Sequence, residues 1–256
     1  MSVQSVHRAI DILSLFSPAR PWLGVTEISQ ALDLPKPTIH GLIQTLVKRG
    51  FLTQDPDSRK YSLGLSIYEL GTILAGSLRI NQVAAEPAQR LARQSGLVAR
   101  VAIWDSESVL VTLNLFPQAS EPIPNNLGPR LPAYCSAVGK AVLAFLPPEQ
   151  LDAYMKNVRF MPFTPNTITT KKRLRDDLKA ARKVGFSRES GEFLQGLACI
   201  GAPLLDRNGG PVGSISLSGA PGEMTDSVVA EQASNLLRIA REISGYLGYR
   251  ISASTF

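Results

Sequence analysis

The side chains able to do covalent chemistry are few in this sequence, and they do not assemble into a reactive set. Its histidines and cysteines are His7, His40, Cys135 and Cys199. These are too few for a zinc finger or a disulfide framework, and no histidine follows residue 40 to activate Cys199 as a nucleophile. We expect Cys199 to be a small buried apolar side chain. Glu189 and Glu192 could form a catalytic carboxylate pair, but no metal cluster or general acid–base set completes such a site. The sequence therefore favours a protein that is not an enzyme and has no metal or cofactor.

The chemistry that the sequence does offer is hydrogen bonding and positive charge along one helix, residues 36–49. Apolar residues recur there at the spacing of one helical stripe, at Ile39, Leu42, Ile43 and Leu46. The opposite face carries Lys36, His40, Gln44, Lys48 and Arg49 and no acidic residue. A helix with an apolar back and a basic front suits the major groove of DNA. An ordinary solvated surface helix would also have a polar front, so both interpretations stand at this point.

The elements around this helix have the order of a winged helix-turn-helix. A helix over residues 2–16 comes first, and a short helix with Thr26 as its N-cap precedes a break at residues 33–35. After residue 49, two β-like runs flank a turn-rich cluster in residues 51–63, which predicts a hairpin. The candidate DNA contacts, on the helix and on flanking phosphates, are Arg8, Lys36, Thr38, His40, Gln44, Lys48, Arg59 and Lys60.

The rest of the chain predicts a linker and a larger second domain. We expect a DNA-binding domain over residues 1–63, a linker helix over 64–79 and a second domain over 80–256. In that domain, helices are expected at 82–95, 136–146, 148–157, 170–184 and 226–248, and strands on either side of 105–108 and at 198–205 and 211–218. Helices mixed with hairpins predict an α+β domain with an antiparallel sheet rather than a parallel doubly wound one.

Segments along nearly the whole chain resemble the IclR-type transcriptional regulators. They are SVHRAIDILSLF, ALDLPKPTIHGLIQTL, GFLTQDPDSRKYSLG, LPAYCSAVGKAVLAFL, TPNTITTKKRL and GEFLQGLACIGAPLLD. The resemblance implies a winged helix, a linker helix and a GAF/PAS-like effector-binding domain. It also implies dimers, often paired into tetramers, on palindromic operators. Pro37 and Gly41 depart from the family's usual Ser and Arg, so an operator sequence cannot be transferred from relatives.

The same resemblance implies a pocket for a small organic acid in the second domain. Matching positions are Ala137, Val138, Glu189, Cys199, Ser216 and Ser218. The last two lie two apart on a strand and so share a face. Backbone N–H groups at the start of the 136–146 helix could seat an anion, and the long loop over 117–130 is expected to be functional. Arg100 and Arg130 are candidates to pair with a carboxylate. For Arg100, the exposed face of a half-buried strand is the alternative. Glu189 would repel a carboxylate unless it is protonated or accepts a ligand hydroxyl.

Length and composition agree with a cytoplasmic DNA-binding protein. The chain has 256 residues, a net charge of +6 and a sequence pI near 9.5, which permits an acidic partner. No apolar run approaches the ~20 residues of a membrane span. We expect a ligand-responsive regulator that binds double-stranded DNA and forms a homodimer or tetramer, with apolar stripes on residues 1–16 and 64–78 at the dimer interface. The alternatives are a DNA-binding protein whose second domain only oligomerises, and an enzyme built on the α+β domain.

Overall fold

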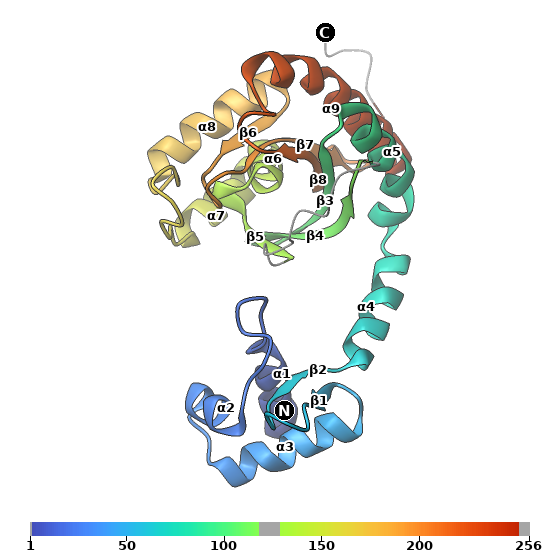
Figure 1. The fold of residues 1–256 in the computed structure, drawn as a ribbon. Coiled ribbons are helices and arrows are strands. Elements are labelled where there is room, and N and C mark those ends of the chain that lie inside the picture. Colours follow the sequence, from blue (N-terminus) through green and yellow to red (C-terminus); the bar gives the residue numbers. More distant parts are fainter. Residues whose placement is uncertain (1, 118–128, 251–256) are drawn as a thin grey trace. The chain divides into compact units, whose positions relative to one another are not determined.

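The computed structural model describes residues 2–117 and 129–250, and the chain divides into two compact units between Ser77 and Leu78. The first unit consists of α1 (Gln4–Ser14), α2 (Val25–Leu32), α3 (Lys36–Lys48), β1 (Leu52–Gln54), β2 (Tyr61–Leu63) and α4 (Leu65–Ser77). β1 and β2 form an antiparallel hairpin in which Leu52 pairs with Leu63. This order of elements confirms the predicted winged helix-turn-helix (Figure 1).

The core of the first unit fixes the angle between α2 and α3. It contains Ile12, Leu23, Ile28, Ile39, Ile43, Leu46, Leu52 and Tyr61. α2 ends at Asp33 in the left-handed conformation, with φ of 50°, and Pro37 lies in the first turn of α3, where its missing N–H costs no hydrogen bond. The Ser29 hydroxyl donates to the Leu34 carbonyl at 2.6 Å and holds the turn.

One prediction for the first unit needs correction. Thr26 is not the N-cap of α2, because the helix begins at Val25 and Gly24, two residues before Thr26, is the cap. The Gly24 N–H donates to Glu27 Oε2 at 2.8 Å, which satisfies a donor that the helix leaves free. A helix, α4, occupies residues Leu65–Ser77 of the segment predicted as a linker helix, and it groups with the first unit. Its start is tied to the end of α3, since the Ser66 N–H donates to the Gly50 carbonyl at 3.1 Å.

The second unit is an α+β domain with an antiparallel sheet, as predicted, and the sheet has six strands. Its elements are α5 (Arg79–Ser95), β3 (Val98–Asp105), β4 (Ser108–Leu115), β5 (Arg130–Pro132), a 3-10 turn (Ala133–Cys135), α6 (Ala137–Phe145), α7 (Pro148–Asn157), α8 (Lys171–Val184), β6 (Ser187–Ser190), β7 (Ala198–Leu205), β8 (Pro211–Gly219) and α9 (Asp226–Tyr246). The strand order is β5-β4-β3-β8-β7-β6. The edge strands β5 and β6 were not predicted. Of the loop predicted at 117–130, residues 118–128 lie outside the described residues.

The two faces of this sheet have different chemistry. Alternate residues of β8, Ile215 and Leu217, pack with α5 and α9 in the main hydrophobic core (Figure 1). The residues between them, Ser214, Ser216 and Ser218, point to the other face, where α6 lies against β7 and β8. We call the face that meets α6 the inner face. No helix in residues 2–117 or 129–250 is both long and apolar enough to cross a membrane.

Candidate DNA interface and effector site

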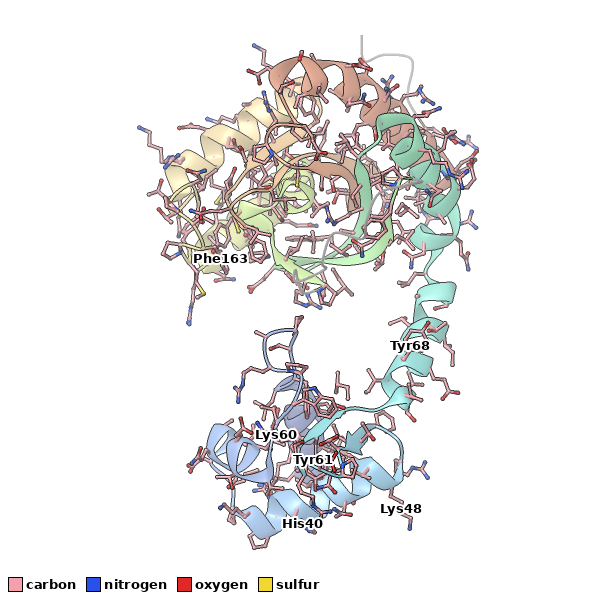
Figure 2. The ribbon with its side chains drawn as sticks, in the orientation of Figure 1. His40, Lys48, Lys60, Tyr61, Tyr68 and Phe163 are labelled. Carbon is pink, nitrogen blue, oxygen red and sulfur yellow. The ribbon has the colours of Figure 1, made fainter. Side chains whose placement is uncertain are left out.

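The outward face of α3 is basic and free. Ile39 and Ile43 are fully buried on the inward side. Four polar residues of the outward side are exposed, and their side chains make no hydrogen bond or ion pair to any described residue: Lys36, His40, Gln44 and Lys48. His40 and Lys48 project from α3 away from the unit's core, in which Tyr61 lies (Figure 2). The helix therefore presents cations and hydrogen-bonding groups that no residue of its own unit uses.

The other predicted DNA contacts differ from one another in exposure and in ion pairing. Thr38 and Arg8 are half-buried, and Arg59 is exposed at the hairpin turn in a left-handed conformation, with φ of 57°. Lys60 is not free, because its Nζ lies 3.6 Å from Glu27 Oε2. The side chains of Lys60 and Glu27 are 47% and 43% exposed, so solvent screens this ion pair and a phosphate could displace Glu27 at little cost. Gly41 is exposed with open space beyond its Cα, so this one position of the helix offers no side chain to DNA.

Strand register brings most of the predicted effector residues onto the inner face. Arg100 pairs with Ser216 across β3 and β8, and Ser218 pairs with Cys199 across β8 and β7. Cys199 in turn pairs with Glu189 of β6. Paired residues of an antiparallel sheet point to the same side, so these five side chains lie on one surface. All five are buried.

Ala137 and Val138 of α6 lie against this surface through their backbone. The Ser187 hydroxyl donates to the Ala137 carbonyl at 2.6 Å, and the Ser214 hydroxyl donates to the Val138 carbonyl at 2.8 Å. At the start of α6, Ser136 Oγ accepts the Gly139 N–H at 3.2 Å. One N–H of the predicted anion seat is thus used by the N-cap.

Arg100 is buried, which contradicts the alternative of an exposed strand face. The residue is 7% exposed, and its Nε donates to Asn114 Oδ1 at 3.1 Å. Burial lowers the pKa of the Arg100 guanidinium, but arginine stays protonated in proteins. Its two Nη groups have no hydrogen-bond partner among the described residues. A buried cation with unused donors is a natural anchor for a carboxylate.

Arg130 is placed apart from this group. It pairs with Leu110 of β4, which pairs with Ile103, and Ile103 packs in the core on the opposite face of the sheet. Its Nη1 lies 2.7 Å from Asp105 Oδ2 and donates to the Ser108 hydroxyl. Arg130 lines an open cavity of about 680 Å³ at the edge of the sheet. The structure therefore does not bring Arg130 together with Arg100. Two-residue periodicity could not assign the face of Arg130, because its short strand was not recognised in the sequence.

A buried ion cluster adjoins the inner face, and sequence reasoning missed it. Lys140 of α6 is fully buried, with its Nζ 2.6 Å from Glu192 Oε1 and 3.0 Å from Asp177 Oδ2. The Glu192 N–H donates to Glu189 Oε1 at 2.6 Å. The signal was present, because Lys140 is the single charged residue in the apolar segment AVGKAVLAF, and a buried charge requires a partner.

Burial is the main cause of the shifted pKa values of the titratable groups on and beside the inner face. Burial raises the pKa of Glu189, and burial together with the carboxylates of Asp177 and Glu189 raises the pKa of Glu192 to about 7, against the lowering effect of Lys140. Burial raises the pKa of the Cys199 thiol to about 12, so it is not a thiolate nucleophile. Within the described residues no group of three or more side chains could hold a metal ion. The arrangement can bind a ligand but lacks a nucleophile–base pair.

Comparison with known proteins identifies the family of both units. The family model for the IclR helix-turn-helix domain matches residues 5–56, and the model for the bacterial transcriptional regulator IclR C-terminal domain matches residues 73–245. The chain is 30% identical to the HTH-type transcriptional regulator XynR of Escherichia coli K12 over 96% of its length and 98% of that protein.

Solved structures share the fold. The IclR structure from Thermotoga maritima superposes with a TM-score of 0.75 at 28% identity, covering 96% of this chain and 99% of that one. An IclR homolog from Microbacterium hydrocarbonoxydans, complexed with 4-hydroxybenzoate, gives a TM-score of 0.79 at 23% identity, covering 95% and 99%. With both of its units matched in order, the chain belongs to the IclR family of bacterial transcriptional regulators and is a DNA-binding regulator, not an enzyme.

Proposed function

We propose that this regulator binds a palindromic operator through α3 and that a small organic acid, bound on the inner face of the sheet, changes its affinity for that operator. The observation that carries the proposal is the buried cation of Arg100, which pairs with Ser216, on the same face as Ser218, whose Oγ is buried without a hydrogen-bond partner among the described residues. Buried polar groups in native proteins are normally satisfied. A carboxylate would satisfy both.

The DNA half of the proposal is supported by the charge of α3. Gln44 could hydrogen-bond an adenine edge with its amide, and Lys36 and Lys48 could neutralise phosphates. Affinity should fall steeply with salt, since phosphate contacts release counterions. Because operator DNA is the proposed partner, the cytoplasm is the proposed location.

Dimerisation is supported by apolar side chains that the first unit leaves uncovered. Val6 and Ile10 of α1 are 54% and 55% exposed, and Leu70, Ile73 and Leu74 of α4 are 53%, 64% and 56% exposed. Contiguous exposed apolar groups of this kind mark interfaces. We propose a homodimer through α1 and α4, which can pair further into a tetramer. Sedimentation should show no monomer at micromolar concentration, and monomer alone would refute the proposal.

The effector half is supported by the chemistry of the inner face. Hydroxyls, a guanidinium and apolar walls are typical of small-acid pockets, and a distant relative of the same fold holds 4-hydroxybenzoate. The alternative is a second domain that only oligomerises. It predicts that no acid binds and that operator affinity is insensitive to acids.

Calorimetry on the full chain distinguishes an effector-binding second domain from one that only oligomerises. Replacing Ser216 and Ser218 together with alanine should weaken binding of an identified acid and leave operator affinity without ligand nearly unchanged. Ser214→Ala is the matched control, because Ser214 shares the strand and face but its hydroxyl is used by Val138. If the double variant binds the acid as tightly as wild type, the pocket lies elsewhere.

The DNA claim is tested by fluorescence anisotropy with the DNA upstream of the protein's own gene. Binding should be tighter than to a shuffled sequence of equal length and composition. Equal affinities for the two DNAs would refute sequence-specific binding to the upstream DNA.

A further inference from the structure

Most of the net positive charge of this chain lies in one helix of the second unit. α8 has seven basic and two acidic residues among its 14 residues, so it carries a charge of +5. The whole chain carries +6, and α3 carries +2. α8 lies on the outside of the second unit, against α6 and β6 (Figure 1). The largest concentration of positive charge is therefore outside the helix-turn-helix.

α8 buries its apolar side and exposes its basic side. Leu174, Leu178 and Ala181 are the buried apolar residues. Five cations of the helix are exposed, and their side chains make no hydrogen bond or ion pair to any described residue: Lys171, Lys172, Arg173, Lys179 and Lys183. The exposed Asp176 forms no ion pair with any of them. The five cations therefore contribute no contact that holds the second unit together.

The two other cations of α8 are used within the unit. Arg175 Nη2 donates to Asp152 Oδ1 at 3.1 Å. Arg182 Nη1 donates to the Ala144 carbonyl at 3.2 Å, and its guanidinium lies 5.7 Å from the centroid of the Phe145 ring. These contacts explain why cations occupy positions 175 and 182, and the five exposed cations have no such explanation.

Three of the five cations lie where positive charge is unfavourable. Lys171, Lys172 and Arg173 form the first turn of α8, which has no acidic residue. The N-terminal end of a helix carries a partial positive charge, so cations there are repelled and acidic residues are preferred. Among the described residues no ion pair offsets this repulsion. A local cost without a structural gain is expected at positions that serve a function.

Three of the exposed lysines form a straight row, which we call the lysine row: Lys172, Lys179 and Lys183. Residues seven and eleven positions further along a helix of 3.6 residues per turn point in nearly the same direction. Eleven residues at a rise of 1.5 Å extend over about 16 Å. Duplex DNA of that length carries about ten phosphate charges. The row can therefore contact more than one phosphate at the same time.

Other acidic partners match α8 less well than duplex DNA does. Protein interfaces have apolar centres and few lysines, and the exposed side of α8 has one large apolar residue, Val184, at its last position. Single-stranded nucleic acid is bound on aromatic side chains, and α8 contains none. A helix that lies on a membrane inserts its apolar side, and this side of α8 is buried.

From the charge, its cost and its spacing we infer that α8 is a second DNA-binding surface, on which the lysine row contacts phosphates of duplex DNA without reading the base sequence. This goes beyond operator recognition by α3, because the contact is made by the second unit. Phosphate contacts add affinity for any sequence. Each lost contact should lower the slope of log affinity against log salt by about 0.9.

Fluorescence anisotropy tests the inference on the full chain with a random-sequence duplex of about six helical turns, over a series of salt concentrations. Lys172→Gln/Lys179→Gln/Lys183→Gln should weaken binding at low salt and lower the salt slope by roughly 2–3. The control, Arg93→Gln/Arg207→Gln/Arg241→Gln, removes the same charge at exposed positions of α5, the β7–β8 turn and α9. It should leave the slope unchanged. Thermal melting checks that both triple variants are folded.

A second measurement uses the wild-type protein. Acetic anhydride modifies exposed lysines, and mass spectrometry gives the rate at each position. Random-sequence duplex DNA at low salt should slow modification of the lysine row, and high salt should abolish this protection because it releases phosphate contacts.

The outcomes separate α8 from α3. If the lysine row is not protected, or if its triple variant keeps the wild-type slope, α8 does not bind DNA. Lys48→Ala changing the slope in the same assay would leave DNA binding by α3 intact. If the triple variant and the control lower the slope equally, the effect comes from total charge and the inference is wrong. Binding of polyglutamate as tight as that of DNA, lost in the triple variant, would assign the surface to an acidic protein instead.

Discussion

Replacing Lys140 with methionine should destabilise the effector-binding unit strongly. Lys140 is fully buried, with carboxylate oxygens of Glu192 and Asp177 at 2.6 and 3.0 Å. Methionine keeps the length of the side chain but leaves Glu192 as a buried carboxylate without its cation. Removing one partner of a buried ion pair costs roughly 3–5 kcal/mol. We expect a loss of this size at about pH 8, where Glu192 is ionised.

The loss should depend on pH in a defined direction. In wild type the pKa of Glu192 is about 7 in the folded state, above its ordinary value of 4.5. The folded state therefore binds this proton more tightly than the unfolded state, and this group makes the free energy of unfolding fall as pH rises from about 4.5 to about 7. Without Lys140 the folded pKa rises further. The variant should then be closest to wild type at about pH 5 and furthest from it at about pH 8.

Urea unfolding followed by tryptophan fluorescence measures this effect. The chain has two tryptophans, so a Trp22→Phe background leaves Trp104 of β3 as the reporter of the second unit. The double variant Lys140→Met/Glu192→Gln removes both charges and should recover ~2 kcal/mol relative to the single variant. The reasoning is refuted if the single variant is within about 1 kcal/mol of wild type at high pH, or if the double variant is no more stable than the single.

Three further predictions concern two helical glycines and one exposed lysine. Gly41→Ala should stabilise the first unit by about 1 kcal/mol in thermal melting, because Gly41 is helical and an alanine Cβ at this position would have open space around it. Gly139→Ala should destabilise the second unit by roughly 1–3 kcal/mol, because its Cβ would lie 2.3 Å from Ala133 Cα. Lys48→Ala should weaken binding to operator and random DNA alike, and lower the salt slope by about 1. An unchanged slope would exclude a phosphate contact.

The first unit could be predicted because each of its elements leaves a pattern in a short stretch of neighbouring residues. Apolar residues at helical spacing gave α1 and α3, and the turn-rich cluster between two short β-like runs gave the hairpin. The N-cap of α2 was misassigned because Thr26 is a better cap by residue type than Gly24. The position of the cap is set by the hydrogen bond between the Gly24 N–H and the Glu27 side chain. The preferences of single residue types for the cap position do not predict this bond.

The second unit shows where local patterns stop being informative. Ser216 and Ser218 could be assigned to one face because a strand has a period of two. The edge strands β5 and β6 are three and four residues long and partly polar, so they have no readable period. Without them, the pairings of Arg130 with Leu110 and of Glu189 with Cys199 could not be foreseen. The cluster of Lys140, Glu192 and Asp177 joins residues far apart in the chain, and only tertiary structure brings them together.

The most direct test of the proposed mechanism is the operator affinity of the full chain with and without a saturating small organic acid, identified by calorimetry, at fixed salt. The ligand must prefer one DNA-binding state, since equal affinity for both would shift nothing. We expect the acid to change the operator dissociation constant by about 5-fold or more, and operator DNA to change the affinity for the acid by the same factor. The Ser216→Ala/Ser218→Ala variant should show neither change at the same acid concentration. An operator affinity that is identical with and without a bound acid would contradict the account.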